Sequence, residues 1–224
     1  MYKGLEPNGG VCMRRFEYGW IQSLSLDMDI LSLIAGIYRA NGKEEVLLSQ
    51  SPAILDSLVE LAKVQSTEAS NAIEGIVTTS TRLRQLVADK TTPRNRDEQE
   101  IMGYRDALNV IHESYDSISL CRNHILQLHK ILYNYQFNAR GGQLKSVQNY
   151  ISVTYPDGRT EVLFTPLAPY ETAEALDQIC AEYNRVVGNG EVEPLLAIPI
   201  FIHDFLCIHP FNDGNGRMSR LLTT

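Results

Sequence analysis

Apolar residues recur three and four positions apart over most of the chain, which is the spacing of amphipathic helices. The first such pattern ends near Asn41 and Gly42, and the second starts at Ser51 and Pro52, a good N-cap followed by a proline at the first helical position. The spacing predicts helices over residues 24–42, 51–74, 101–111, 120–133, 171–187 and 194–207.

One segment has a different pattern. Ile151, Val153 and Tyr155 alternate with polar residues up to the turn sequence at 156–158, and apolar residues return at Val162 and Phe164. This alternation predicts a β-hairpin with a turn of three to five residues. The chain is therefore expected to be mainly α-helical, with a single hairpin.

Two sets of side chains are expected to be buried. The first is a stripe along the second helix, formed by Leu55, Leu58, Val59 and Ala62. The second consists of aromatic and aliphatic residues of the later helices, Tyr170, Tyr183, Ile198 and Phe201. His124 and His129 are expected to be surface or satisfied core residues rather than metal ligands.

A polar segment at residues 90–97, which contains Pro93, is the expected boundary between two parts of the chain. We expect an N-terminal helical module over residues 1–95 and a core over residues 96–224. A chain of 224 residues that is 44% hydrophobic can form one sizeable core or two small ones.

Charge and cysteine content narrow the class of protein. The net charge is −7 and no basic run is present, so direct binding to nucleic acid is not expected. No apolar stretch is long enough to cross a bilayer, and the N-terminus has no apolar signal core. The four cysteines are scattered without paired spacing, which is typical of reduced thiols in a cytoplasmic protein.

The residues best suited to catalysis and to binding phosphate or metal lie between His209 and Arg220. A Gly-Asn-Gly turn at 214–216 can present several backbone N–H groups to one anion, and a helix that starts there adds its positive end. Arg217 and Arg220 are three residues apart, so on a helix they are expected to share a face and bind phosphates. Asp213 suits Mg²⁺, and His209 can accept a proton near neutral pH.

Other known binding motifs fit the sequence at 209–220 less well. The bidentate glutamate of an EF-hand is missing, and the sequence of a P-loop occurs nowhere in the chain. His203, Cys207 and His209 suggest zinc, but no fourth ligand is evident. The run predicts a nucleotide-triphosphate site with its own base.

Residues 209–220 resemble, without a mismatch, the signature of the Fic (Fido) family, His-Pro-Phe-x-[Asp/Glu]-Gly-Asn-Gly-Arg-x-x-Arg. The resemblance implies an all-α Fic-type core with one β-hairpin flap. It also implies the transfer of AMP from ATP to a Ser, Thr or Tyr hydroxyl of a target protein, and of the enzyme itself.

The resemblance also implies a role for each residue of the signature. His209 would be the catalytic base, Phe211 would hold the loop in the core, and Asp213 would bind Mg²⁺. The nucleotide would be bound by Gly214, Asn215, Gly216, Arg217 and Arg220.

A second motif lies upstream, where residues 70–75 resemble the inhibitory sequence Ser/Thr-x-x-x-Glu-Gly/Asn of some family members. Ser70, Glu74 and Gly75 match it. The resemblance implies that Glu74 pairs with Arg220, which cannot then bind the γ-phosphate. Gly75 is also a natural helix C-cap, so Glu74 is expected at the end of a helix.

The hairpin occupies the place of the family's flap, which aligns the target through strand-like pairing. The residues expected to dock the target are Gln148, Asn149, Tyr150, Ile151, Ser152 and Val153. Family members usually continue beyond the second signature arginine through a long apolar helix. Because this sequence stops at Thr224, we expect it to be truncated in that helix.

The sequence therefore favours an autoinhibited protein adenylyltransferase that uses ATP and Mg²⁺. Its partners would be a target protein and a second copy of itself, with no nucleic acid and no membrane. Three alternatives stay open: removal of AMP, use of another nucleotide, and a nucleotide-sensing module whose catalysis is vestigial.

Overall fold

The computed structural model describes residues 16–50, 52–136 and 141–224, and the side chains within them except those of 45–50 and 52–56. Two short 3-10 helices, η1 (Gly19–Ser23) and η2 (Tyr115–Ser117), accompany the longer elements. The α-helices are α1 (Met28–Gln50), α2 (Pro52–Ile73), α3 (Ser80–Val87), α4 (Arg96–Ser114), α5 (Arg122–Leu132), α6 (Pro169–Gly188), α7 (Pro194–Ile208) and α8 (Asn215–Thr223). The strands are β1 (Ile151–Thr154) and β2 (Thr160–Phe164).

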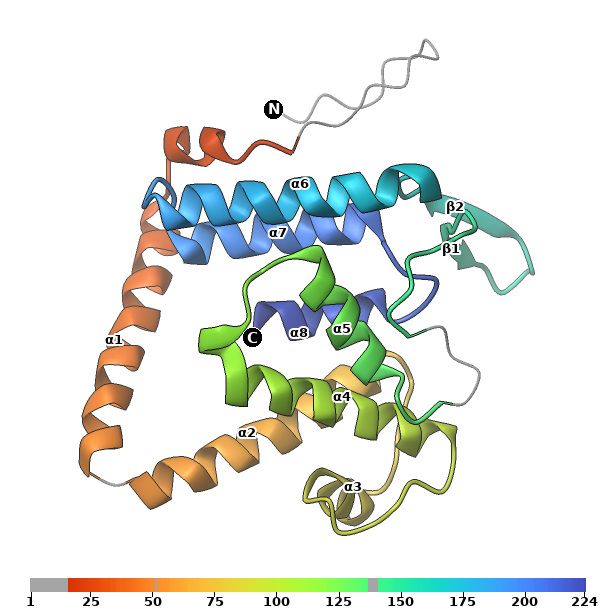
Figure 1. Ribbon diagram of the computed structural model, residues 1–224, viewed down its shortest axis with the longest axis horizontal. Coiled ribbons are helices and arrows are strands. Elements are labelled where there is room, and N and C mark those ends of the chain that lie inside the picture. Colours follow the sequence, from red (N-terminus) through yellow and green to blue (C-terminus); the bar gives the residue numbers. More distant parts are fainter. Residues whose placement is uncertain (1–15, 51, 137–140) are drawn as a thin grey trace.

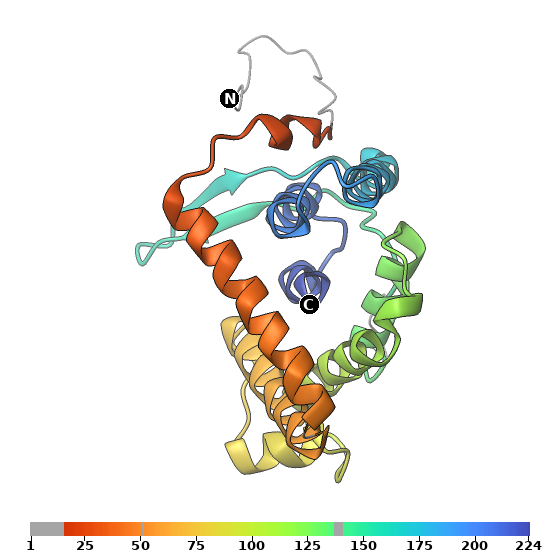
Figure 2. The same cartoon turned by 90° about the vertical axis from the view of Figure 1, so that its left-hand side faces the viewer.

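Helix α8 lies in the middle of the fold. In Figure 1, α6 and α7 run side by side along one flank, and α4 and α5 form the other. Figure 2 shows α8 between these two layers, with α1 and α2 as an arm along the outside. Because α8 packs against α7, α4 and α2, its first turn is held by segments far apart in the sequence.

Two apolar clusters stabilise this arrangement. The larger cluster extends over helices α4, α5, α6, α7 and α8, and Leu176, Phe205 and Phe211 are among its fully buried members. The smaller packs α3 against α4 through Leu86 and Ile101. Such close-packed contacts fix the relative positions of the helices.

Several predicted boundaries are confirmed. Helix α2 begins at Pro52 and ends at Ile73, and Gly75 follows with a φ of +75°, the left-handed conformation of a helix C-cap. The hairpin is present, with Thr154 paired to Thr160 across a five-residue turn. Ser51, the predicted N-cap, lies outside the described residues.

Two local predictions are wrong. Helix α1 does not end near Gly42 but continues to Gln50, because the following lysine, glutamate and leucine residues favour helix and outweigh one glycine. Helix α3 was not expected; it starts where the Thr79 side chain accepts a hydrogen bond from the Arg82 backbone N–H.

Burial was also predicted wrongly at several positions. Tyr170 is 80% exposed, because it lies in the first turn of α6 beside Pro169, at the edge of the fold. On α2, Leu58 is 51% exposed and Ala62 is exposed as well. No described segment covers this face of α2, so helical spacing alone did not show which apolar stripe is buried. Leu55 lies outside the described side chains.

No helix in the described ranges is long and apolar enough to span a membrane.

A buried ion pair fixes the segment between α3 and α4. Arg82 donates from Nε and Nη2 to the two carboxylate oxygens of Glu98, each at 2.9 Å. The Arg94 backbone N–H donates to Glu98 at 2.8 Å. These hydrogen bonds, that from Arg82 first, lower the pKa of the Glu98 carboxyl to about 2.

The Arg82–Glu98 pair predicts how stability depends on pH. Because the Glu98 pKa is lower in the folded than in the unfolded chain, its contribution is present above about pH 4.5 and is lost toward pH 2. Glu98→Gln should therefore flatten the acid limb of the unfolding free energy. It should also cost about 3–5 kcal/mol near neutral pH, since Arg82 is left unpaired.

Urea unfolding from pH 2 to 7 measures both effects. Glu113→Gln, on the exposed surface of the same helix, is the matched control. An unchanged acid limb in Glu98→Gln would contradict the assigned role of this pair.

Candidate active site

The signature forms a tight turn between α7 and α8. Helix α7 ends at Ile208, and His209 has a φ of 50°, in the left-handed region. Gly214 precedes α8 with a φ of 80°. A Cβ at this position would also lie 2.9 Å from the Tyr133 hydroxyl oxygen, so both backbone conformation and space require glycine.

The middle of the turn is anchored in the core. Phe211 is fully buried, and its ring stacks on that of His129 at 3.7 Å between centroids. The Phe211 backbone N–H donates to Asn215 Oδ1 at 2.9 Å, and Asn215 Nδ2 donates to the Phe211 carbonyl at 2.8 Å. Asn215 is 3% exposed, so its side chain holds the loop from within.

His129 is a satisfied core residue, as the sequence predicts. Its Nδ1 accepts from the Gly142 backbone N–H at 2.9 Å, which leaves Nε2 to donate to the Asp213 carbonyl at 3.1 Å. Burial lowers the His129 pKa to about 4, so the ring is neutral near pH 7. It therefore holds the turn without adding charge.

His209 is half-buried at the start of the turn. Its Nδ1 is buried and has no hydrogen-bond partner among the described residues. Burial, followed by the positive charge of Lys145, lowers the His209 pKa, although a backbone contact at Leu206 opposes this. The neutral ring is the form that can accept a proton.

Asp213 lies on the opposite side of the turn with an exposed carboxylate. One of its oxygens accepts from the Gly214 backbone N–H at 2.7 Å. Among the described residues no cluster of three or more His, Cys, Asp or Glu side chains could hold a metal. A single exposed carboxylate can supply one of the ligands of Mg²⁺, which usually takes the others from phosphate and water.

Arg220 is bound to α2 by three hydrogen bonds. Its Nε donates to Ser70 Oγ at 2.8 Å, and its Nη2 donates to the Ser70 carbonyl at 3.0 Å and to Glu74 Oε1 at 2.6 Å. The structure thus brings the upstream motif and the second arginine of the signature into direct contact.

The Glu74 carboxylate also lies over the first turn of α8. A Cβ built on Gly216 would be 2.5 Å from Glu74 Oε1, so a side chain at this position would push the end of the Glu74 side chain aside. The first backbone N–H groups of a helix have no partner within the helix, and the helix dipole makes this end positive. The carboxylate therefore lies beside the end of α8 that favours an anion, and its hydrogen bond there comes from Arg220.

Arg217 points elsewhere. Its side chain is 2% exposed, with Nη1 2.8 Å from a carboxylate oxygen of Glu100. Its Nη2 donates to the Tyr133 hydroxyl at 3.0 Å. This placement departs from the prediction that the two arginines share a face: Arg217 reaches α4 and α5, whereas Arg220 reaches α2, because their charged partners lie on different helices.

The hairpin also differs in part from its predicted surface. Tyr150, Ile151 and Ser152 are exposed. Gln148 and Asn149, however, point back into the protein, where they donate to the Pro166 and Phe211 carbonyls at 3.0 Å each. The site of strand-like docking is therefore expected to begin after Asn149 rather than at Gln148.

Sequence reasoning missed Tyr133, Glu100 and Lys145. Burial raises the pKa of the Tyr133 hydroxyl, and the nearby Asp213 carboxylate adds to the shift. Each of these residues lies in an ordinary helix or loop pattern. Tertiary contacts between residues far apart in the sequence bring them to the site.

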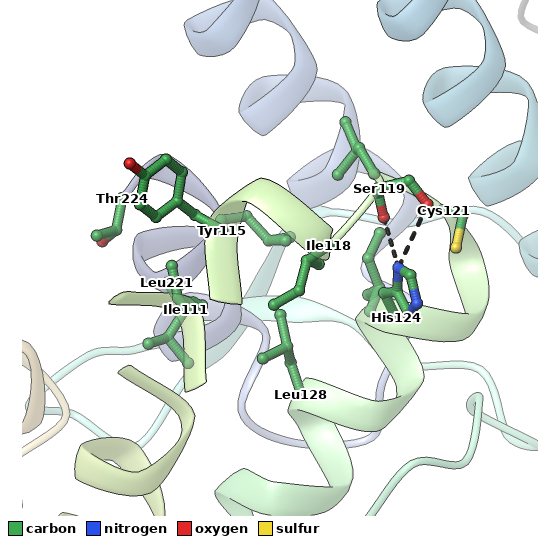
Figure 3. A pocket seen from close by; sticks show the side chains of 12 residues that line it. Ile111, Tyr115, Ile118, Ser119, Cys121, His124, Leu128, Leu221 and Thr224 are labelled. Carbon is green, nitrogen blue, oxygen red and sulfur yellow. Dashed lines mark hydrogen bonds between the residues drawn. The ribbon is translucent and has the colours of Figure 1, made fainter. Parts of the chain in front are cut away.

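Two cavities flank this part of the protein. One, of about 210 Å³, lies beside Asp213 and is lined by polar side chains that include Arg96 and Gln136. The other, of about 130 Å³, is mainly apolar and lies at the far end of α8 (Figure 3). There His124 Nδ1 contacts the Ser119 carbonyl at 2.7 Å, so this histidine is satisfied too. The apolar cavity contains none of the signature turn.

Comparisons with known proteins show which family the chain resembles. Residues 119–224 match the Fic/DOC family. The protein adenylyltransferase fic-1 of Caenorhabditis elegans is 27% identical over 132 residues, 57% of this chain and 23% of that protein. The protein adenylyltransferase Fic of Nematostella vectensis is 26% identical over 161 residues, 68% of this chain and 34% of that protein. The matched part of the chain thus spans 23% and 34% of the length of these two relatives.

The fold has solved counterparts. A Fic domain containing signaling protein from Bacteroides thetaiotaomicron is 25% identical, with a TM-score of 0.71, and the match covers 84% of this chain and 70% of that one. The shared fold, the matched region and the signature turn lead to the same conclusion: this chain contains a domain of the Fic/DOC family.

Proposed function

We propose that this chain is an autoinhibited protein adenylyltransferase, which transfers AMP from ATP to a hydroxyl side chain of a protein. The observation that carries the proposal is the position of the Glu74 carboxylate, paired with Arg220 at 2.6 Å above the first turn of α8. A site that already holds one anion can accept the phosphates of a nucleotide in its place.

The chemistry follows from the residues around the turn. His209 would take the proton of the target hydroxyl, whose oxygen then attacks the α-phosphorus. The bond from this phosphorus to the bridging β-phosphate oxygen breaks, and pyrophosphate leaves. The products are an AMP ester of the target and pyrophosphate, so that no further reactant is needed.

The remaining residues would bind and orient the nucleotide. The backbone of Gly214, Asn215 and Gly216 and the Arg220 guanidinium would hold the phosphates. Mg²⁺ held by Asp213 would neutralise part of the phosphate charge. Arg217 would act indirectly, because its ion pair with Glu100 fixes α8 from behind.

Inhibition would follow from competition for Arg220. The Glu74 and Arg220 side chains are 39% and 28% exposed, so solvent weakens their attraction, typically to ~0–1 kcal/mol for such pairs. A pair of this strength can be displaced. The similarity to named protein adenylyltransferases supports the reaction class. Because the identity is low, it leaves the target protein undefined.

Removal of the Glu74 carboxylate should activate the protein. In Glu74→Ala, Arg220 loses its carboxylate partner and keeps only its hydrogen bonds to Ser70, so phosphates can reach it more easily. Self-labelling with radiolabelled ATP and Mg²⁺ should therefore rise by up to ~5-fold, the factor that corresponds to ~1 kcal/mol. The matched control is Glu68→Ala, which removes an exposed carboxylate from α2, the helix that ends just before Glu74. It should label itself as the wild type does. Equal labelling in all three would argue against inhibition by Glu74.

Removal of the base should abolish this activity. His209→Ala in the Glu74→Ala background should lower the labelling rate by ~10²–10⁴-fold, the usual contribution of a positioned base, while ATP still binds in calorimetry. His124→Ala, which removes a histidine on α5 away from the turn, is the control.

The same assay separates the alternatives. Binding of ATP without labelling in any variant would favour a nucleotide sensor. Release of AMP from a labelled protein, without new labelling, would favour the reverse reaction.

A further inference from the structure

One short segment donates hydrogen bonds to the backbone on both sides of His209. The carbonyls of four consecutive residues, 208–211, each accept from residues 145–149. Lys145 donates from Nζ to the Ile208 carbonyl and from its backbone N–H to the Pro210 carbonyl, both at 2.8 Å. Asn149 Nδ2 donates to the His209 carbonyl at 3.3 Å and to the Phe211 carbonyl at 3.0 Å.

These carbonyls need partners from outside their own helix. The last carbonyls of a helix have no intrahelical donor, and the left-handed turn at His209 ends α7 abruptly. An ammonium group at the C-terminal end of a helix is also favoured by the helix dipole. Lys145 supplies both the donor and the charge.

Lys145 is an unusual residue in this position. It is 3% exposed, and among the described residues no carboxylate lies within ion-pair distance of it. Besides the Ile208 carbonyl, Nζ donates only to Asn149 Oδ1, at 3.1 Å, within the part of the chain described. Burial lowers the Lys145 pKa to about 8, and the more distant carboxylate of Glu171 opposes this shift only in part. The contacts of Nζ to the loop therefore offset part of the cost of burying the cation.

The same segment leads directly into the hairpin. One residue, Tyr150, separates Asn149 from β1, and Gln148 Nε2 donates to the Pro166 carbonyl just beyond β2 at 3.0 Å. The two ends of the hairpin are therefore joined at the place where the segment contacts the His209 loop, as the course of the chain in Figure 1 illustrates.

We propose that Lys145 and Asn149 are positioning residues for His209. They set the backbone that carries the base and connect it to the base of the hairpin, so a segment docked on the hairpin and the proton acceptor keep a fixed relation. This inference rests on the proposed transferase function. The coupling of Lys145 to His209 can, however, be measured without any catalysis.

The test uses the full chain with Glu74→Ala as the active parent. Lys145→Met removes the charge and the Nζ donors at similar length, and Lys145→Arg restores a charged donor. Asn149→Ala removes two contacts to the loop and keeps the charge. Lys130→Met, an exposed lysine on α5, is the matched control.

The first readout is the pKa of His209, from NMR titration of its ring proton, which His209→Ala identifies. Its pKa depends on burial, on the Leu206 backbone contact and on the charge of Lys145. Lys145→Met should raise this pKa, because a nearby positive charge is lost. Lys145→Arg and Lys130→Met should leave it near the parent value.

The second readout is labelling kinetics. Lys145→Met and Asn149→Ala should each lower kcat by ~10²-fold, as expected for a displacement of about 1 Å at the base, and change KM for ATP less than ~2-fold. Lys145→Arg should recover most of kcat. A purely structural role would instead lower the melting temperature and change kcat and KM together.

The outcomes distinguish a failure of the positioning role from a failure of the proposed function. If the parent labels itself and both variants keep its kcat, the positioning role is wrong and the proposed function stands. If the parent does not label itself, the proposed function fails, and the NMR titration still decides whether Lys145 acts on His209. An unchanged His209 pKa in folded Lys145→Met overturns the inference, and should Lys145→Met not fold, an unchanged kcat in Asn149→Ala does so.

Discussion

The positive end of α8 favours a nearby anion, and in this structure the Glu74 carboxylate lies beside it. The carboxylate lies 2.6 Å from Arg220 and in the space that a side chain at Gly216 would fill. The helix dipole and the Arg220 guanidinium both favour negative charge in this region. If this region is the phosphate site of the proposed function, an entering phosphate must displace Glu74, and the residue that follows α2 is then in direct contact with the active site.

The loop around this anion site is fixed by contacts from several directions. His129 and Asn215 hold its middle from the core, and Lys145 and Asn149 bind its carbonyls from the base of the hairpin. Arg217 anchors α8 to α4 through Glu100. With the turn held in this way, His209 stays half-buried at the start of the turn, where burial lowers its pKa. Preorganisation of this kind avoids the cost of ordering the site during the reaction.

Local sequence signals predicted what is locally determined. Periodic apolar spacing located most helices, the Pro52 start and the Gly75 end of α2, and the residues of the signature turn are recognisable because they are adjacent in the chain. The pattern failed where a tertiary partner decides. It could not show that Arg217 turns toward Glu100, that Asn149 binds the Phe211 carbonyl, or that Leu58 stays half exposed. Gly42 misled the prediction because one glycine weakens a long helix without ending it.

The most direct test of competition at α8 is the affinity for ATP, measured by calorimetry on the wild type, Glu74→Ala and Glu68→Ala at one salt concentration. Competition predicts that ATP binds Glu74→Ala more tightly than the wild type, by up to ~5-fold, with Glu68→Ala unchanged. Equal dissociation constants for the wild type and Glu74→Ala would contradict the claim that the carboxylate and the phosphates share one position.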